Sequence, residues 1–162
     1  MRRRMLLFAL MALILALAMT ACSSKTDAAA GAAQATEPEA VAGLVIDATT
    51  LTEAPTFVDW NQDGTAMQLI ARKAEGQVRL AFNTCQSCGG SPYAWFEDLG
   101  DGNLQCQNCG LTFPLETVGT EKAAGCNPVT IADFIVEGDV VTIPAALLAD
   151  NAARFANWKH FE

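Results

Sequence analysis

Alternation of apolar and polar side chains predicts two paired strands near the middle of the chain. Residues 65–71 carry apolar side chains at every second position from Met67 onwards, and residues 78–82 show the same spacing. This spacing is typical of strands that are buried on one face only. Residues 73–76 lie between them and end in glycine, which suits a hairpin loop. We therefore predict an antiparallel hairpin in this region.

A second hairpin and a helix are predicted towards the C-terminus. β-Branched residues at 135–136 and 140–143 flank a Gly-Asp pair at 138–139, which suits a tight turn. Pro144 then suits the start of a helix, because the first turn of a helix leaves its N–H groups unpaired. Residues 145–158 are rich in Ala and Leu at helical spacing. These elements predict an α+β domain of antiparallel hairpins with a C-terminal helix packed on the sheet.

The first 21 residues have the pattern of a targeting signal. Arginines at 2–4 precede an apolar run over residues 5–19, which is shorter than the roughly 20 residues that span a bilayer. A bulky apolar residue and two smaller ones, 19–21, then precede Cys22. This order resembles the lipobox of bacterial lipoproteins, in which the cysteine becomes the first mature residue and carries acyl chains. We predict lipidation at Cys22; the alternative is an ordinary cleaved signal followed by an incidental cysteine.

The remaining chain divides into a predicted tether, residues 22–51, and a predicted folded domain, residues 52–162. Residues 23–43 are rich in Ala, Ser, Thr, Gly and Glu and contain no aromatic side chain, so they cannot bury enough surface to order themselves. An Ala-rich helix is the alternative within this stretch, and residues 43–47 could instead begin a strand. In either case the segment would hold the domain away from the membrane.

Charge and composition exclude several classes of function. Beyond the signal, 7 basic and 18 acidic side chains leave a net charge of −11, which repels phosphate backbones and excludes nucleic acid as a partner. The single histidine, His160, excludes a His-rich metal site. Common nucleophile, phosphate-loop and dinucleotide motifs are absent, and the neighbours Glu97 and Asp98 are interpreted as solvated side chains. A hydrolase or transferase is therefore not expected.

An acidic stretch upstream of the first hairpin resembles half of a calcium loop. Asp59 to Gly64 places oxygen-bearing side chains at alternate positions with glycine sixth, but Ile70 stands where a bidentate glutamate is required. We interpret this stretch as a turn.

The cysteines indicate a metal site. Two Cys-x-x-Cys-Gly units contain Cys85, Cys88, Cys106 and Cys109, and seventeen residues separate Cys88 from Cys106. Two intervening residues allow one turn to direct both sulfurs at one ion, and the glycine permits the positive φ that closes the turn. The spacing predicts zinc-ribbon-like or rubredoxin-like knuckles around a four-thiolate site, with zinc, iron or an iron–sulfur cluster as candidates.

Cys126 is a fifth cysteine in the predicted domain. Because four sulfurs complete a tetrahedron, it is either a further or replacement ligand or a structural thiol, and both interpretations stay open. Exported proteins often oxidise their thiols, so disulfides are another alternative. Thiol exchange of the thioredoxin type is less favoured, because both units follow a strand or loop and precede glycine, whereas a redox-active pair begins a helix.

The order of these motifs is more specific than any one of them. The strand ends in Phe82-Asn83-Thr84-Cys85, and there follow Cys106-Gln-Asn-Cys109-Gly110 with Phe113-Pro114, then Gly125-Cys126-Asn127-Pro128, then Phe134 and Val136-Glu-Gly-Asp139. This combination, over residues 77–143, resembles the FtrD-like family of membrane iron–sulfur-containing proteins. The resemblance implies an extracytoplasmic Cys-rich domain near iron-permease systems, with a metal centre held by the two Cys-x-x-Cys pairs and Cys126. Family members are often fused to membrane spans, which a lipid on Cys22 would replace here.

We therefore expect a lipid-anchored, extracytoplasmic protein of the cell-envelope membrane that binds an iron–sulfur cluster or iron, with zinc as the alternative. The resemblance implies support of electron transfer or metal handling linked to iron uptake, with an iron permease or an electron-transfer system as partner. Two other functions stay open: a binding module with a purely structural four-cysteine zinc site, and a thiol–disulfide exchange protein.

Overall fold

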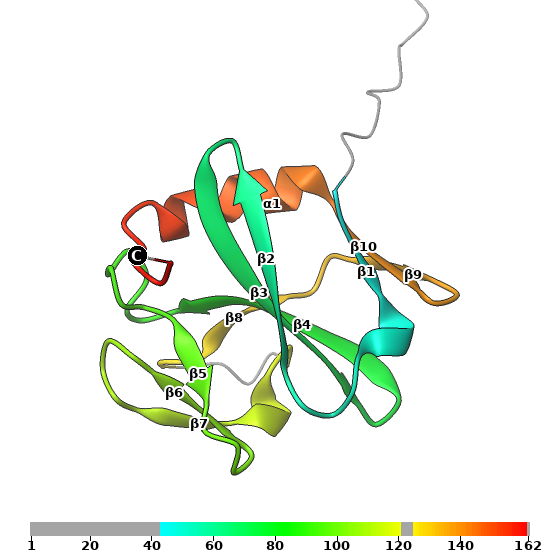
Figure 1. The fold of residues 1–162 in the computed structure, drawn as a ribbon, viewed down its shortest axis with the longest axis horizontal. Helices are drawn as coiled ribbons and strands as arrows, with labels where there is room; N and C mark the ends of the chain where they lie inside the picture. Colours follow the sequence, from blue (N-terminus) through cyan, green and yellow to red (C-terminus); the bar gives the residue numbers. More distant parts are fainter. Residues whose placement is uncertain (1–42, 121–124, 162) are drawn as a thin grey trace, which may run out of the picture. The chain divides into compact units, whose positions relative to one another are not determined.

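The computed structural model describes residues 43–120 and 125–161, which form three antiparallel sheets and one short α-helix (Figure 1). The predicted signal peptide, Cys22 and most of the predicted tether lie outside the described residues. Among the described residues, no helix has the length and apolar character needed to cross a membrane. The prediction of a domain built mainly from antiparallel strands, with a C-terminal helix, is confirmed.

The central sheet has the strand order β2-β3-β4-β8, with β2 at Thr56–Gln62, β3 at Thr65–Ala74, β4 at Gln77–Cys85 and β8 at Pro128–Ile131. The predicted hairpin is confirmed, because β3 and β4 pair with Ala74 opposite Gln77.

Both tight turns of this sheet have the backbone that two-residue hairpins require. Glu75 and Gly76 have φ of 53° and 76°, and Asp63 and Gly64 have φ of 52° and 89°. Positive φ at both central residues matches the right-handed twist of the flanking strands. The calcium-like stretch is therefore the turn between β2 and β3, as interpreted from the sequence.

Strands β3 and β4 of the central sheet are buried on both faces over most of their length, which corrects the prediction of half-buried strands. Side chains on one face, such as Leu69 and Phe82, belong to one apolar cluster, whereas Ile70 and Ala81 belong to a second cluster on the other face. Figure 1 shows α1 (Ala145–Asn151) and a third sheet, formed by β5 (Phe96–Asp98), β6 (Asn103–Cys106) and β7 (Thr112–Pro114), on opposite sides of β4 and β8. Alternation failed as a guide here because elements distant in the sequence cover both faces.

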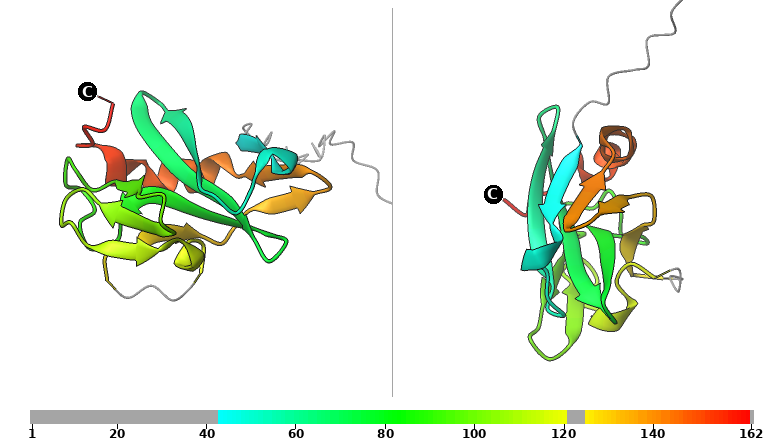
Figure 2. Two further views of the ribbon diagram at one scale, coloured as in Figure 1. Left: turned by 60° about the horizontal axis from the view of Figure 1, so that its bottom comes forward. Right: turned by 90° about the vertical axis from the view of Figure 1, so that its right-hand side faces the viewer.

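The folded domain begins before residue 52, which corrects the predicted end of the tether. β1 (Leu44–Asp47) pairs with β10 (Val140–Ile143), and β10 pairs with β9 (Ile135–Glu137), as Figure 2 shows. The short 3₁₀ helix Ala48–Thr50 follows, with the side chain of Asp47 accepting a hydrogen bond from its second residue. Leu44, Ile46, Ala48 and Leu51 are all buried, so this segment contributes to the core. The predicted hairpin of β9 and β10 is confirmed.

The C-terminal helix is shorter than the predicted 145–158. α1 spans Ala145–Asn151 and continues as a tighter 3₁₀ helix over Ala152–Phe155. The change of pitch leaves Phe155 buried with its ring edge-on to Phe82, at 6.1 Å between centroids. Packing of this aromatic pair therefore accompanies the end of the regular helix.

The third sheet has the order β5-β6-β7, with β5 at Phe96–Asp98, β6 at Asn103–Cys106 and β7 at Thr112–Pro114. A 3₁₀ helix, Leu115–Thr117, follows β7. The short strands of this sheet pack on the central sheet through the second apolar cluster, which includes Cys85 and Cys106. The two Cys-x-x-Cys units thus come from two different sheets.

Candidate metal centre

The first Cys-x-x-Cys unit is anchored by the central sheet. Cys85 is the last residue of β4 and is completely buried, and its N–H donates to Ala94 O at 2.8 Å. The positive φ lies at Gly90, at 87°, rather than at the expected Gly89. A Cβ added at Gly89 would lie 3.2 Å from Cys85 O, so Gly89 allows close backbone approach instead.

The second Cys-x-x-Cys unit begins at the end of β6 and is positioned by that strand. Cys106 ends this strand and is fully buried, and its N–H donates to Leu111 O at 2.9 Å. The N–H of Gly110 donates to Cys106 O at 2.8 Å, and Gly110 has the expected positive φ of 73°. This unit therefore forms the predicted tight turn.

Cys126 reaches the centre because β8 pairs with β4. Pro128, the first residue of β8, lies opposite Cys85, and the N–H of Gln86 donates to Asn127 O at 2.9 Å. These contacts place the segment that carries Cys126 beside the first unit, although about forty residues separate them in the chain.

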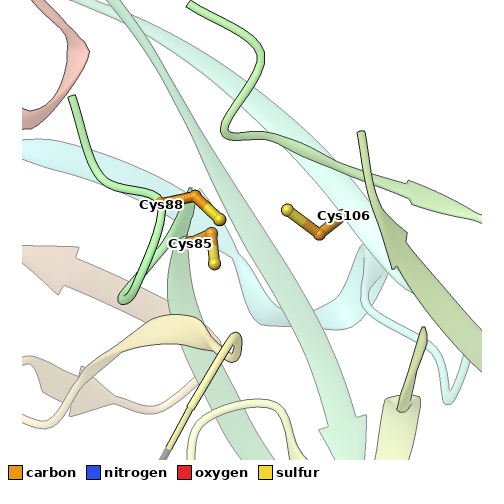
Figure 3. A group of neighbouring side chains, drawn as sticks. All are labelled: Cys85, Cys88 and Cys106. Atoms are coloured by element: carbon orange, nitrogen blue, oxygen red, sulfur yellow. The ribbon is translucent and has the colours of Figure 1, made fainter. Parts of the chain in front are cut away.

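The five thiols form two groups that share Cys88. Within each group the sulfurs lie within 4.8 Å of one another: Cys85, Cys88 and Cys106 form the first, and Cys88, Cys109 and Cys126 form the second. Figure 3 shows the sulfur of Cys106 facing those of Cys85 and Cys88 across the gap between the two sheets. We call these groups the inner triad and the outer triad. Such thiol groups could hold a metal ion, whereas the individual ligands stay a prediction.

The two triads differ in exposure. Cys85 and Cys106 of the inner triad are buried, whereas Cys109 is exposed and Cys126 is half-buried. Burial raises the pKa of the Cys85 and Cys106 thiols, that of Cys106 to about 11. A bound cation would stabilise their thiolates, because it supplies the opposite charge that the apolar surroundings lack.

The outer triad has a different electrostatic environment. The backbone N–H of Leu111 lowers the pKa of the Cys109 thiol below its usual value. The hydrogen bond between Cys109 and Cys126, at 3.5 Å between sulfurs, is the main cause that raises the pKa of Cys126. Between Cys109 and Cys126, negative charge is therefore favoured on the exposed Cys109.

Two buried polar side chains attach the third sheet to the central sheet, and the sequence-based reasoning did not single them out. Asn83 Oδ1 accepts from Phe96 N–H at 2.8 Å, and Asn83 Nδ2 donates to Phe96 O at 3.2 Å and to Gln68 Oε1 at 2.7 Å. Arg72 Nη1 donates to Leu115 O at 2.5 Å.

We expect Asn83→Ala to destabilise the folded domain by about 2–3 kcal/mol, because it leaves the buried N–H and C=O of Phe96 without their partner. Urea unfolding measures this difference. Asn157→Ala is the matched control, since its exposed amide makes one hydrogen bond, to Gly90 O, and should cost less than about 0.5 kcal/mol. Equal losses in the two variants would contradict the role given to Asn83.

His160 lies outside both triads, in an aromatic cluster. Its ring is 4.9 Å from both Trp95 and Trp158, and burial lowers its pKa. It also lines a cavity of about 400 Å³ together with Phe57, Gln68, Phe96, Glu97 and Asp98. Glu97 and Asp98 are exposed, as expected from the sequence.

Comparison with known proteins places most of the described domain in one family. The model of the family described as "Membrane iron-sulfur containing protein FtrD-like" matches residues 52–155. No curated protein and no solved structure matches the chain.

Proposed function

The chain belongs to the FtrD-like family of membrane iron–sulfur-containing proteins, and we propose that it is a lipid-anchored, extracytoplasmic metal-binding protein. Its proposed role is to support electron transfer or metal handling linked to iron uptake. The observation that carries this proposal is the meeting of five thiols in two triads that share Cys88. A donor set made only of thiols suits iron–sulfur clusters, iron or zinc. When bound, iron would supply one-electron chemistry.

The unequal exposure of the two triads favours metal or electron exchange over a purely structural zinc site. A structural four-cysteine site has all four metal positions filled by protein ligands, and its role requires no exposed ligand. Here Cys85 and Cys106 would hold the metal from the buried side, whereas Cys109 lies at the surface, where a partner can approach. The apolar cluster around the inner triad, which includes Phe96 and Leu104, would keep water from that side.

The proposed location and partners rest on the sequence. Lipidation of Cys22 would hold the domain at the outer surface of a cell-envelope membrane. An iron permease or an electron-transfer system in the same membrane is the proposed partner. The strongly acidic composition beyond the signal peptide disfavours nucleic acid.

The metal content of the purified protein tests this function. We expect the chain from Ser23 onwards, which keeps every described residue, to retain iron when it is prepared without oxygen. Visible absorption, iron, zinc and labile sulfide are measured on the same sample. Iron with sulfide indicates a cluster, and iron without sulfide but with thiolate absorption indicates a mononuclear site.

Two results would contradict the proposal and identify its alternatives. A colourless protein with one firmly bound zinc would indicate a structural site in a binding module. A protein without metal and without free thiols would indicate a thiol–disulfide protein.

A further inference from the structure

Two thiols on the exposed side of the centre, Cys109 and Cys126, are in direct contact. The sulfurs of Cys109 and Cys126 lie 3.5 Å apart, and they come from separate segments of the chain. We propose that Cys109 and Cys126 are a thiol–disulfide switch, which closes on reaction with a small disulfide and thereby lowers the affinity of the centre for its metal. This inference rests on the proposed function, because it concerns the regulation of the same site.

Cys109 is the exposed thiol among the five cysteines, and Cys126, whose sulfur is in contact with it, is the proposed resolving partner. Cys85 and Cys106 have no exposed surface, so an external disulfide cannot reach their sulfurs, whereas Cys109 is exposed. Each Cys-x-x-Cys unit contains one of these two buried residues. Direct attack of an external disulfide on the buried member of either unit would therefore need the fold to open first.

The surroundings of the pair leave room for the reaction. A Cβ added at Gly110 or at Gly125 would have no atom of the described residues within 4 Å, so the described part of the chain leaves open space next to both cysteines. A small disulfide can approach there, and the two turns can move the short distance from sulfur contact to a covalent bond.

The exchange balances with oxidised glutathione as the oxidant. The thiolate of Cys109 attacks one sulfur of glutathione disulfide, which forms a mixed disulfide and releases one glutathione thiolate. The thiolate of Cys126 then attacks the Cys109 sulfur and releases the second glutathione. Two protein thiols lose two protons and two electrons and form one disulfide, and glutathione disulfide takes up these electrons and protons to become two glutathione thiols.

Closure of the pair removes two of the three thiolates of the outer triad. Cys88 then has sulfur partners only in the inner triad. Loss of one second-sphere contact alone costs a metal site about 10- to 100-fold in affinity, so loss of two thiolates should lower affinity by more than about 100-fold.

Zinc is the probe for the test, because zinc has no redox chemistry of its own. The chain from Ser23 onwards is reduced, loaded with zinc and assayed for bound zinc before any oxidant is added. Glutathione disulfide is then added while a chromogenic chelator reports zinc release and peptide mapping by mass spectrometry locates each bridge. We expect a Cys109–Cys126 bridge to form in step with zinc release, and a dithiol reductant to restore zinc binding.

Two variants keep the test decisive. Cys126→Ser should form no bridge and should hold a stable glutathione adduct on Cys109, whereas Cys106→Ser should still form the Cys109–Cys126 bridge. The switch is overturned if bridges form first within the Cys-x-x-Cys units, if no bridge forms, or if the bridge forms without zinc release. A reduced chain that binds no metal at all, seen before oxidation, would instead overturn the proposed function and the switch that depends on it.

Discussion

Replacement of Cys88 by serine is expected to remove nearly all metal from the protein. Cys88 belongs to both triads, so its loss leaves two thiols in each. Two thiolates are too few to hold a thiophilic ion against a chelator, and we expect binding to weaken by more than about 100-fold. The measurement is bound metal per chain after dialysis against a competing chelator.

Ser87→Ala is the matched control for this experiment. Ser87 lies in the same turn and is exposed, and the substitution keeps the backbone N–H that hydrogen-bonds to Cys85. This variant should bind metal as the natural chain does. Cys126→Ser, which alters the outer triad alone, should retain part of the metal. Full retention of metal by Cys88→Ser would show that the two triads do not form the centre.

Removal of the metal is expected to lower the stability of the folded domain by at least about 4 kcal/mol. A ligand at a thousandfold excess over its dissociation constant contributes that much, and thiolate metal sites exceed this ratio. For a domain of this size the melting temperature should fall by at least about 15 °C. Thermal unfolding of the same sample, with metal and after chelation, measures the shift.

The loss of stability should be greatest in the third sheet. Strands β5, β6 and β7 are short, and Cys85 and Cys106 are themselves part of the apolar cluster that attaches this sheet. Hydrogen exchange should therefore accelerate there on chelation, whereas the sheet of β1, β10 and β9 serves as the internal control. Chelation of the Cys88→Ser variant should produce no further shift. Uniform loss of protection would contradict the link between metal and third sheet.

Local chemistry in the sequence determined the hairpins and turns. The loop at 73–76 and the Gly-Asp pair at 138–139 predicted the β3–β4 and β9–β10 hairpins, because tight turns need particular residues at positive φ. The length of the C-terminal helix was predicted less well. An Ala-rich pattern continues past Asn151, but the chain there forms a 3₁₀ helix, at whose end Phe155 packs against Phe82.

The start of the domain and the burial of the central sheet depended on contacts across the chain. β1 is a strand because β10, about a hundred residues later, supplies its hydrogen-bond partner. Ile70 and Ala81 are buried because the third sheet covers them. Neither contact leaves a periodic signal in the strand itself, since alternation records only one buried face.

For the candidate metal centre, the sequence by itself predicted which sulfurs lie near one another, because the spacing within each Cys-x-x-Cys unit sets the geometry of one turn. Only the tertiary structure decided how these sulfurs divide between a buried and an exposed triad, and why Cys126 joins them. That arrangement depends on the pairing of β8 with β4 and on the attachment of the third sheet through Asn83. Both are long-range contacts, whose partners are selected by the packing of the whole domain rather than by neighbouring residues.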